Sequence, residues 1–148
     1  MTSTETTKWR TDGVTIVRGG LLQDAMAGSG RATAFNFSGA GGEETSGKIW
    51  VGTVTMAPGT KTGVHHHGRH EVAIYVVRGR SRIRWGEQLE FMADVGPGDF
   101  AYFTPFVPHQ EVNLDNNAPL DFVVVRTDSE GIAVRVDVEP VAQPERVY

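Results

Sequence analysis

The stretch PGTKTGVHHHGRHEVAIYVVRG, residues 58–79, decides how the rest of the chain is interpreted. It holds four of the chain's five histidines, followed by Glu71, an apolar run over residues 72–77 and Gly79. Imidazole nitrogens together with a carboxylate are typical ligands of divalent first-row transition metals. The fifth histidine, His109, lies in the later segment PFVPHQEVN. We therefore expect a metal site that takes ligands from both segments.

The positions of the histidines indicate which of them can converge. In an extended chain alternate side chains point to the same side, so His65 and His67 share a side with Glu71. His66 and His70 share the opposite side, and would be neighbours only in a helix, which the following β-branched run disfavours. We therefore favour His65 and His67 as ligands. The alternative is that the histidines form a solvated polar loop that binds no metal.

The composition is that of an ordinary small globular protein. At 148 residues, with 39% hydrophobic and 22% charged residues, the chain fits a single domain. A net charge of -4 gives no reason to expect a nucleic acid or an anionic membrane as partner. The absence of cysteine excludes disulfides and thiolate metal sites. The polar N-terminus lacks the apolar core of a signal peptide, so we expect a cytoplasmic protein.

Short alternating segments predict β-strands. The 18 glycines and seven prolines divide the chain into short pieces, which favours strands over helices. Polar and apolar residues alternate in IWVGTVTM (49–56), RSRIRW (80–85), LDFVVVR (120–126) and IAVRVDVE (132–139). Many short strands in one domain indicate a sandwich or a barrel.

Two groups of side chains have two possible roles each. Three arginines form a basic stripe at alternate positions: Arg80, Arg82 and Arg84. On an outward face the stripe is simply solvated, whereas an inward stripe would indicate an acidic substrate. Four aromatic side chains are expected in the core or on the wall of an apolar pocket: Trp85, Phe100, Phe103 and Phe106.

The histidine segments resemble the two sequence motifs of the cupin superfamily, small jelly-roll β-barrels that hold a metal ion inside the barrel. The first motif is a glycine, five residues, HxH, three or four residues, a glutamate, six residues and a glycine. Gly59, His65, His67 and Glu71 match it, but seven residues rather than six then precede Gly79. A β-bulge would restore the register. Otherwise the residue after the glutamate, Val72, takes the ligand position and the site has three histidines.

The second motif is a glycine, five residues, PxG, two residues, a histidine, three residues and an asparagine. Gly98, His109 and Asn113 match its frame, with Thr104 in place of the proline and Phe106 in place of the glycine. The resemblance covers about residues 50–126. It implies an all-β double-stranded β-helix, the jelly-roll barrel of cupins, and a homodimer.

On this basis we expect one cupin domain over residues 12–139, with its barrel core at 49–127. Residues 1–11 are expected to form a flexible N-terminal arm and residues 140–148 a C-terminal tail. The segment 28–48, rich in glycine, serine and threonine, has two open interpretations, an active-site lid or an arm in a dimer.

The resemblance implies that the metal ligands are His65, His67, Glu71 and His109. Such a donor set suits one divalent transition metal ion per chain, which could be iron, manganese, nickel, cobalt, copper or zinc. Two residues are candidate catalytic groups. Glu111 lies on the His109 side of its strand and could act as a general acid or base, or orient a histidine. Tyr75 continues the face of Glu71 and could donate a proton, although a core aromatic is the simpler interpretation.

The function indicated is that of a small metalloenzyme acting on a small organic molecule, with dioxygenase chemistry as the first hypothesis. The second is a redox-neutral lyase, isomerase or cyclase that uses the metal as a Lewis acid. A third possibility is a module that binds a small ligand without turnover. No nucleic acid or membrane is expected as a partner.

Overall fold

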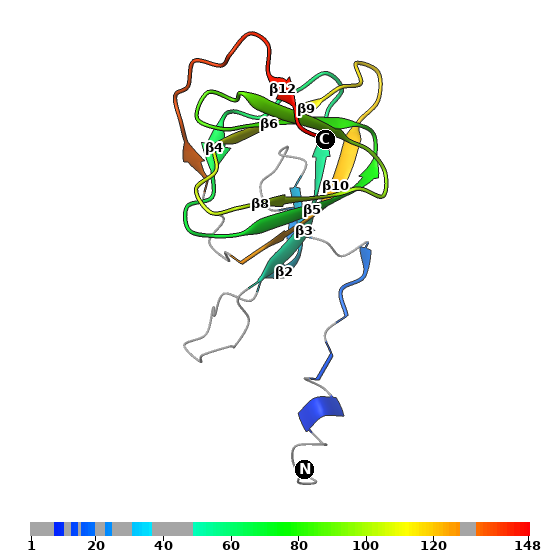
Figure 1. The fold of residues 1–148 in the computed structure, drawn as a ribbon. Helices are drawn as coiled ribbons and strands as arrows, with labels where there is room; N and C mark the ends of the chain where they lie inside the picture. The colour runs from blue at the N-terminus through cyan, green and yellow to red at the C-terminus, as the bar shows by residue number, and fades with distance from the viewer. Residues whose placement is uncertain are drawn as a thin grey trace.

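The computed structural model shows a barrel built from two facing β-sheets (Figure 1). It describes residues 8–10, 13–14, 16–19, 23–24, 31–36, 49–127 and 133–148. The predicted all-β fold is confirmed, since strands make up almost all the regular structure of these residues. No helix in this part of the chain is long and apolar enough to cross a membrane. Most of the expected arm (1–11) and of the segment 28–48 lies outside the described residues.

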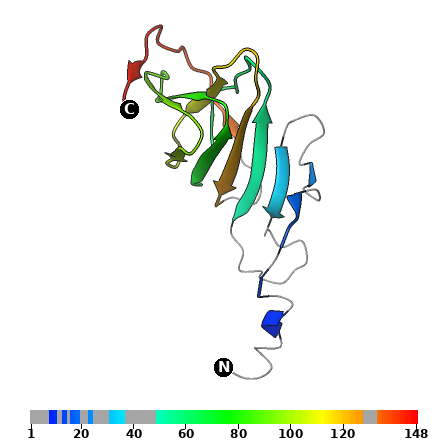
Figure 2. The same ribbon diagram turned by 90° about the vertical axis from the view of Figure 1, so that its right-hand side faces the viewer.

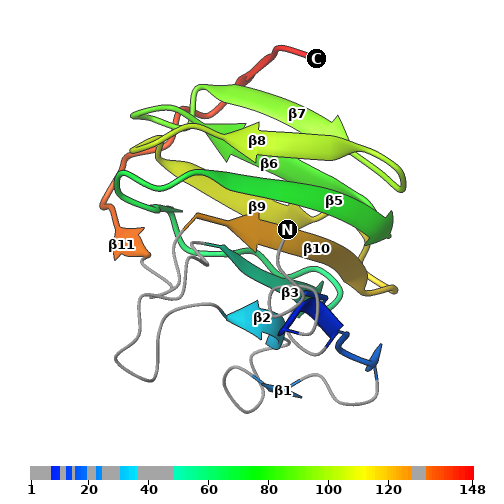
Figure 3. The same cartoon turned by 90° about the horizontal axis from the view of Figure 1, so that it is seen from below.

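Each sheet contains six strands, and antiparallel pairing predominates. The first sheet runs β1 (Gln23–Asp24), β2 (Arg31–Asn36), β3 (Trp50–Met56), β10 (Leu120–Arg126), β5 (Val72–Arg78) and β8 (Phe100–Phe103). The second sheet runs β11 (Val134–Arg135), β4 (His65–His66), β9 (His109–Asn113), β6 (Ser81–Trp85), β7 (Phe91–Val95) and β12 (Glu145–Arg146). Figure 2 shows β2, β3 and β10 side by side. In Figure 3 the strands of the two sheets lie one behind the other.

The first sheet supplies most of the apolar core. As the alternation predicts, Trp50 and Met56 of β3 are buried, and Val54 packs against the core between them. Alternate residues of β5 and β10 are buried in the same way. The buried core consists of Trp50, Met56, Val72, Ile74, Val76, Ile83, Phe103, Leu120, Phe122 and Val124. Burial of one such side chain contributes roughly 1.5–3 kcal/mol, so this core holds the two sheets together.

Strand β9 of the second sheet departs from this pattern. Its buried positions alternate as in any half-buried strand, but they hold His109, Glu111 and Asn113, all of them polar. The Asn113 side-chain amide donates hydrogen bonds to the carbonyl oxygens of Ala57 (3.2 Å) and Ala118 (2.9 Å), so it ties two loops to the barrel. His109 and Glu111 instead face the space between the sheets. The buried face of β9 is therefore polar, whereas β3, β5 and β10 bury mostly apolar side chains.

A β-bulge interrupts the pairing of β5 with β10. Asp121 of β10 pairs with Arg78, whereas the next residue, Phe122, pairs with Val76, so Val77 is left over. The bulge lies near the end of β5, before the turn at Gly79. At Gly79 φ is +90°, and a Cβ atom would come within 2.9 Å of a carbonyl oxygen. Only glycine fits this turn without strain.

The arginine stripe points outward, as the first interpretation predicts. The Arg82 Nε atom donates to Asp94 Oδ1 at 2.8 Å, and the Arg84 guanidinium donates to the carbonyl oxygens of Leu89 and Val141. The stripe therefore fastens the outer surface of the second sheet. It provides no inward positive charge for an acidic substrate.

The prediction for the aromatic residues is partly wrong. Phe103 is buried, and Trp85 packs against the core. Phe100 and Phe106 are instead 76% and 62% exposed. Phe100 lies on the outer face of β8, because its neighbour Ala101 takes the inward position. Phe106 sits in a loop with φ of 62°, which turns its side chain away from the core.

The C-terminal residues return to the barrel. Strand β12 pairs in parallel with β7, and the Val141 N–H donates to the Gln88 carbonyl at 3.0 Å. Strand β11 pairs with β4, placing Arg135 opposite His65. Of the alternating segment 132–139, only Val134 and Arg135 form a strand among the described residues.

Candidate metal centre

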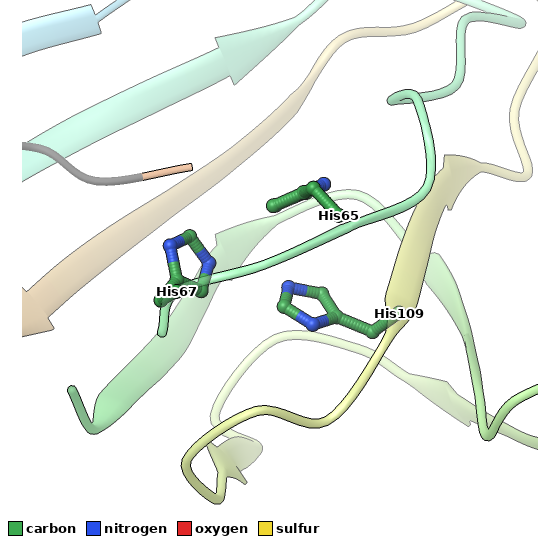
Figure 4. A group of neighbouring side chains, drawn as sticks. All are labelled: His65, His67 and His109. Atoms are coloured by element: carbon green, nitrogen blue, oxygen red, sulfur yellow. The ribbon is translucent and has the colours of Figure 1, made fainter. Parts of the chain in front are cut away.

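Three histidines, two on the paired strands β4 and β9 and one just after β4, form the cluster shown in Figure 4. His65 on β4 and His109 on β9 are directly opposite each other in the sheet. His67 follows β4 and brings its ring to within 4.9 Å of the His65 ring and 5.1 Å of the His109 ring, centre to centre. One ligand atom from each residue lies within 4.8 Å of the other two. Nitrogens about 2.1 Å from one shared ion lie about 3–4 Å apart, so the cluster is close to the spacing that a metal requires.

Backbone carbonyls prepare two of these rings for metal binding. His65 Nδ1 lies 2.9 Å from the Gly63 carbonyl oxygen, and His109 Nδ1 lies 2.9 Å from the carbonyl oxygen of Val107. A carbonyl oxygen can only accept, so each Nδ1 carries the hydrogen and each Nε2 presents a lone pair. A hydrogen bond from the ring nitrogen that does not bind the metal is the usual means of orienting a ligating histidine.

Burial keeps His109 in the form that a metal needs. The side chain is 2% exposed, and its ring stacks 4.3 Å from that of Phe103. Desolvation lowers the pKa of His109 to about 3, and nearby His65 adds to the effect. His109 is therefore a neutral imidazole at pH 7, ready to coordinate without first losing a proton.

A cavity of about 60 Å³ opens onto the cluster between the two sheets. Its polar lining comes from the three histidines together with Thr62, Glu111 and Arg126. The rest of the lining is apolar: Trp50, Val54, Met56, Val72, Ile74, Phe103, Phe122 and Val124. The site thus combines a small, mostly apolar volume with a few polar groups, the usual character of a small-molecule site.

The structure does not bring Glu71 to this cluster. Its side chain is exposed on the outside of the barrel, where it accepts a hydrogen bond from the Tyr102 hydroxyl. That contact raises the pKa of Tyr102. Alternation from His67 does not extend to Glu71, because Gly68 has a positive φ of 61° and the His70 N–H closes a turn onto the His67 carbonyl.

Val72 takes the inward position instead. It is 4% exposed and lines the cavity beside the histidines. The bulge of β5 lies beyond it, at Val77, and so leaves the start of the strand in register. With Val72 at the glutamate position, the first motif regains its six-residue spacing to Gly79. The arrangement corresponds to the three-histidine alternative.

The two candidate catalytic residues lie in different environments. Tyr75 is 37% exposed on the outer face of β5, with its ring 4.7 Å from that of Phe100, so it does not reach the cavity. Glu111 is 7% exposed and lines the cavity. Its backbone is held in place by Thr62, whose N–H donates to the Glu111 carbonyl at 2.9 Å and whose hydroxyl accepts from the Glu111 N–H at 3.0 Å.

The preference for His65 and His67 over their neighbours agrees with the cluster. His66 Nδ1 accepts a hydrogen bond from the Gly68 N–H at 2.9 Å, and its ring lies 5.8 Å from that of Phe106. His66 thus lies on β4 outside the cluster, and it is not among the residues that line the cavity.

Arg126 and Trp50 also face the cavity, and the sequence analysis assigned them no role there. The alternation of β10 does contain the signal for Arg126, because Leu120, Phe122 and Val124 are all buried and Arg126 follows on the same side. This pattern alone does not predict a buried arginine, because an arginine at a strand end is usually solvated.

The model of the cupin domain family matches residues 52–126, which is just over half of the chain. The chain belongs to the cupin family. This match covers β3 through β10 and includes all three clustered histidines. None of the curated proteins shows significant similarity to this cupin.

Solved structures show the same fold. An uncharacterized conserved protein with a double-stranded beta-helix domain from Klebsiella pneumoniae is 17% identical over 84% of this chain and 98% of its own, with a TM-score of 0.62. A cupin 2 domain-containing protein from Halorhodospira halophila is 25% identical over 72% of this chain and 68% of its own, with a TM-score of 0.57.

Oxalate decarboxylase from Bacillus subtilis is 24% identical over 60% of this chain, with a TM-score of 0.52. The matched region spans only 24% of that enzyme, so this likeness concerns the barrel fold alone.

Proposed function

We propose that this cupin is a mononuclear metalloenzyme that acts on a small organic molecule. The observation that carries the proposal is the convergence of His65, His67 and His109 in a cavity that also contains a buried carboxylate, Glu111. The donor set fits a divalent transition metal, since two rings already have their Nδ1 atoms bonded to backbone carbonyls and His109 is neutral. Three protein ligands leave further coordination positions open.

A bound ion would supply Lewis acidity, and a redox-active ion would in addition permit reaction with dioxygen. The chain's own residues would hold the substrate in a small, largely apolar cavity, where polar contacts are stronger than in water. Imidazole ligands suit iron(II) as they suit zinc, copper and nickel, so the donor set is compatible with dioxygenase chemistry, which is our first proposal.

Glu111 favours a second candidate, a redox-neutral lyase, isomerase or cyclase. A buried carboxylate beside a metal site is well placed to take a proton from a substrate and return it elsewhere. Both the N–H and the carbonyl of Glu111 are hydrogen-bonded to Thr62, which fixes the position of the Glu111 backbone beside the cavity. In this case the reaction would need the histidine site and Glu111 but no oxidant.

Metal exchange and oxygen dependence separate these functions. Protein reconstituted with iron(II) or with zinc would be incubated with a panel of small organic acids, carbonyl compounds and diols, with and without oxygen. Oxygen uptake coupled to product with iron alone supports a dioxygenase, whereas product with zinc under anaerobic conditions supports the redox-neutral candidate.

Variants of two carboxylates provide a matched test of the site. Glu111→Gln is expected to lower turnover at least tenfold if Glu111 transfers a proton, because the amide cannot accept one. Glu71→Gln changes an exposed carboxylate outside the barrel and is expected to leave turnover unchanged. A ligand that raises the melting temperature but yields no product in any metal form would instead favour a binding module and contradict the enzyme proposal.

A further inference from the structure

We infer that the C-terminal segment 134–136 positions His65 for metal binding, with Arg135 and Val136 as the positioning residues. The inference rests on the proposed metal site. It concerns residues outside the histidine motifs, in and just after strand β11.

The first argument is the pairing of β4. This strand has two residues, and it pairs with β9 at His65, which lies opposite His109. On its other side both residues of β4 pair with β11, His65 with Arg135 and His66 with Val134. The strand that carries one metal ligand is therefore held between β9, which carries another, and the C-terminal segment.

The second argument is a hydrogen bond just beyond β11. The Val136 N–H donates to the Val64 carbonyl oxygen at 3.0 Å. Val64 lies between His65 and Gly63, and the Gly63 carbonyl oxygen accepts the hydrogen bond from His65 Nδ1. The bond from Val136 thus holds the peptide next to the one that orients the His65 ring.

The third argument is the place of the Arg135 side chain. A Cβ atom on Gly63 would lie 3.2 Å from Arg135 Nη2, so the guanidinium packs directly against Gly63. Arg135 is exposed, and water therefore screens most of its charge. Its main effect on the site is the contact that covers Gly63, the residue whose carbonyl oxygen holds the His65 ring.

These contacts bear on metal affinity because all three histidines must direct a nitrogen to one ion. Loss of a group that holds a ligating histidine in place typically lowers metal affinity about 10–100-fold. The segment 134–136 acts on His65 through Gly63 and Val64. We therefore expect an effect at the lower end of this range, about tenfold.

Titration of the metal-free full-length protein with Co²⁺ tests the inference. Val136→Pro removes the N–H that donates to Val64, and is expected to weaken Co²⁺ binding about tenfold. It should also change the visible absorption of the bound Co²⁺, which depends on the geometry of the ligands. A loss of stability alone would not change this absorption.

Val141→Pro is the matched control in the same C-terminal chain. It removes an N–H that donates to the Gln88 carbonyl at 3.0 Å, in the turn between β6 and β7. We expect it to keep the wild-type Co²⁺ affinity and absorption even if its melting temperature falls. An unchanged Co²⁺ affinity in folded Val136→Pro, or an equal loss in the two proline variants, would overturn the inference and leave the proposed metal site intact.

Arg135→Ala decides the question if Val136→Pro does not fold. Removal of a positive charge near a cation site would by itself tighten metal binding. A Co²⁺ affinity about threefold weaker in Arg135→Ala therefore reports the loss of the contact with Gly63, whereas an unchanged or tighter affinity would overturn the inference. Failure of the wild type to bind any metal would overturn the proposed function, and the inference with it.

Discussion

The burial of His109 predicts that the metal-free protein loses stability between pH 7 and pH 5. The folded-state pKa is about 3, whereas an unfolded histidine titrates near 6.5. Below pH 6.5 His109 binds a proton in the unfolded chain but not in the folded protein, so the free energy of unfolding falls as the pH falls. The stability that this difference in pKa contributes is complete above about pH 6.5 and is lost as the pH approaches 3.

The size of the effect follows from this interval. Each pH unit between the two pKa values lowers the free energy of unfolding by at most about 1.4 kcal/mol, which gives about 2 kcal/mol at pH 5. In a domain of 148 residues this corresponds to a melting temperature lower by roughly 4–8 °C.

Thermal melts at pH 7, 6 and 5 in the presence of a chelator measure the effect. His109→Gln removes the titrating group and keeps a polar side chain of similar size, so its melting temperature is expected to depend less on pH by about the same 4–8 °C. The other histidines remain in both proteins, and the comparison isolates His109. Parallel curves for the two proteins would refute the argument that burial keeps His109 neutral.

Two further predictions concern β5 and the outer surface. Glu71→Gln is expected to leave the metal affinity measured by calorimetry within twofold of wild type. Val72→Glu should instead tighten metal binding. It should also lower the free energy of unfolding of the metal-free protein, measured by urea denaturation, by about 2–4 kcal/mol, because a buried apolar side chain becomes a carboxylate. A loss of affinity in Glu71→Gln would contradict the placement of Glu71 outside. The hydrogen bond from Arg82 is the main cause of the lowered pKa of Asp94, so Asp94→Asn should lower the free energy of unfolding by about 1 kcal/mol at pH 7. This difference should begin to shrink as the pH falls below about 4, where the unfolded carboxylate takes up a proton, and should vanish once the pH is below the lowered pKa of Asp94 in the folded protein. A difference unchanged at pH 2 would argue against it.

The fold could be predicted because its determinants are local. Alternation in residues 49–56 and 120–126 identified both the strands and their inward faces, and the structure buries Trp50, Met56, Phe122 and Val124 accordingly. Glycine and proline turns set the strand lengths. Neither feature requires knowledge of distant contacts.

The site was harder to predict because it depends on one turn. Alternation placed His65 and His67 together and, continued to Glu71, predicted a fourth ligand. The turn closed by His70 onto the His67 carbonyl interrupts the extended chain, so the count starts again at Val72. The turn depends on the positive φ of Gly68. A glycine permits this conformation, but the presence of a glycine in a sequence does not show that the conformation is adopted.

The same argument applies to Tyr75, which shares the outward face of Glu71. Arg126 was missed for another reason. Its inward position follows from the alternation of β10, but the cavity that it lines forms only when the two sheets face each other.

The central claim is that His65, His67 and His109 hold a metal ion. Elemental analysis of protein purified without an affinity tag or chelator, beside His109→Ala, tests it most directly. We predict close to one transition metal ion per chain in the wild type and little or none in the variant. Absence of metal from the wild type, even after reconstitution with each candidate ion in turn, would contradict it.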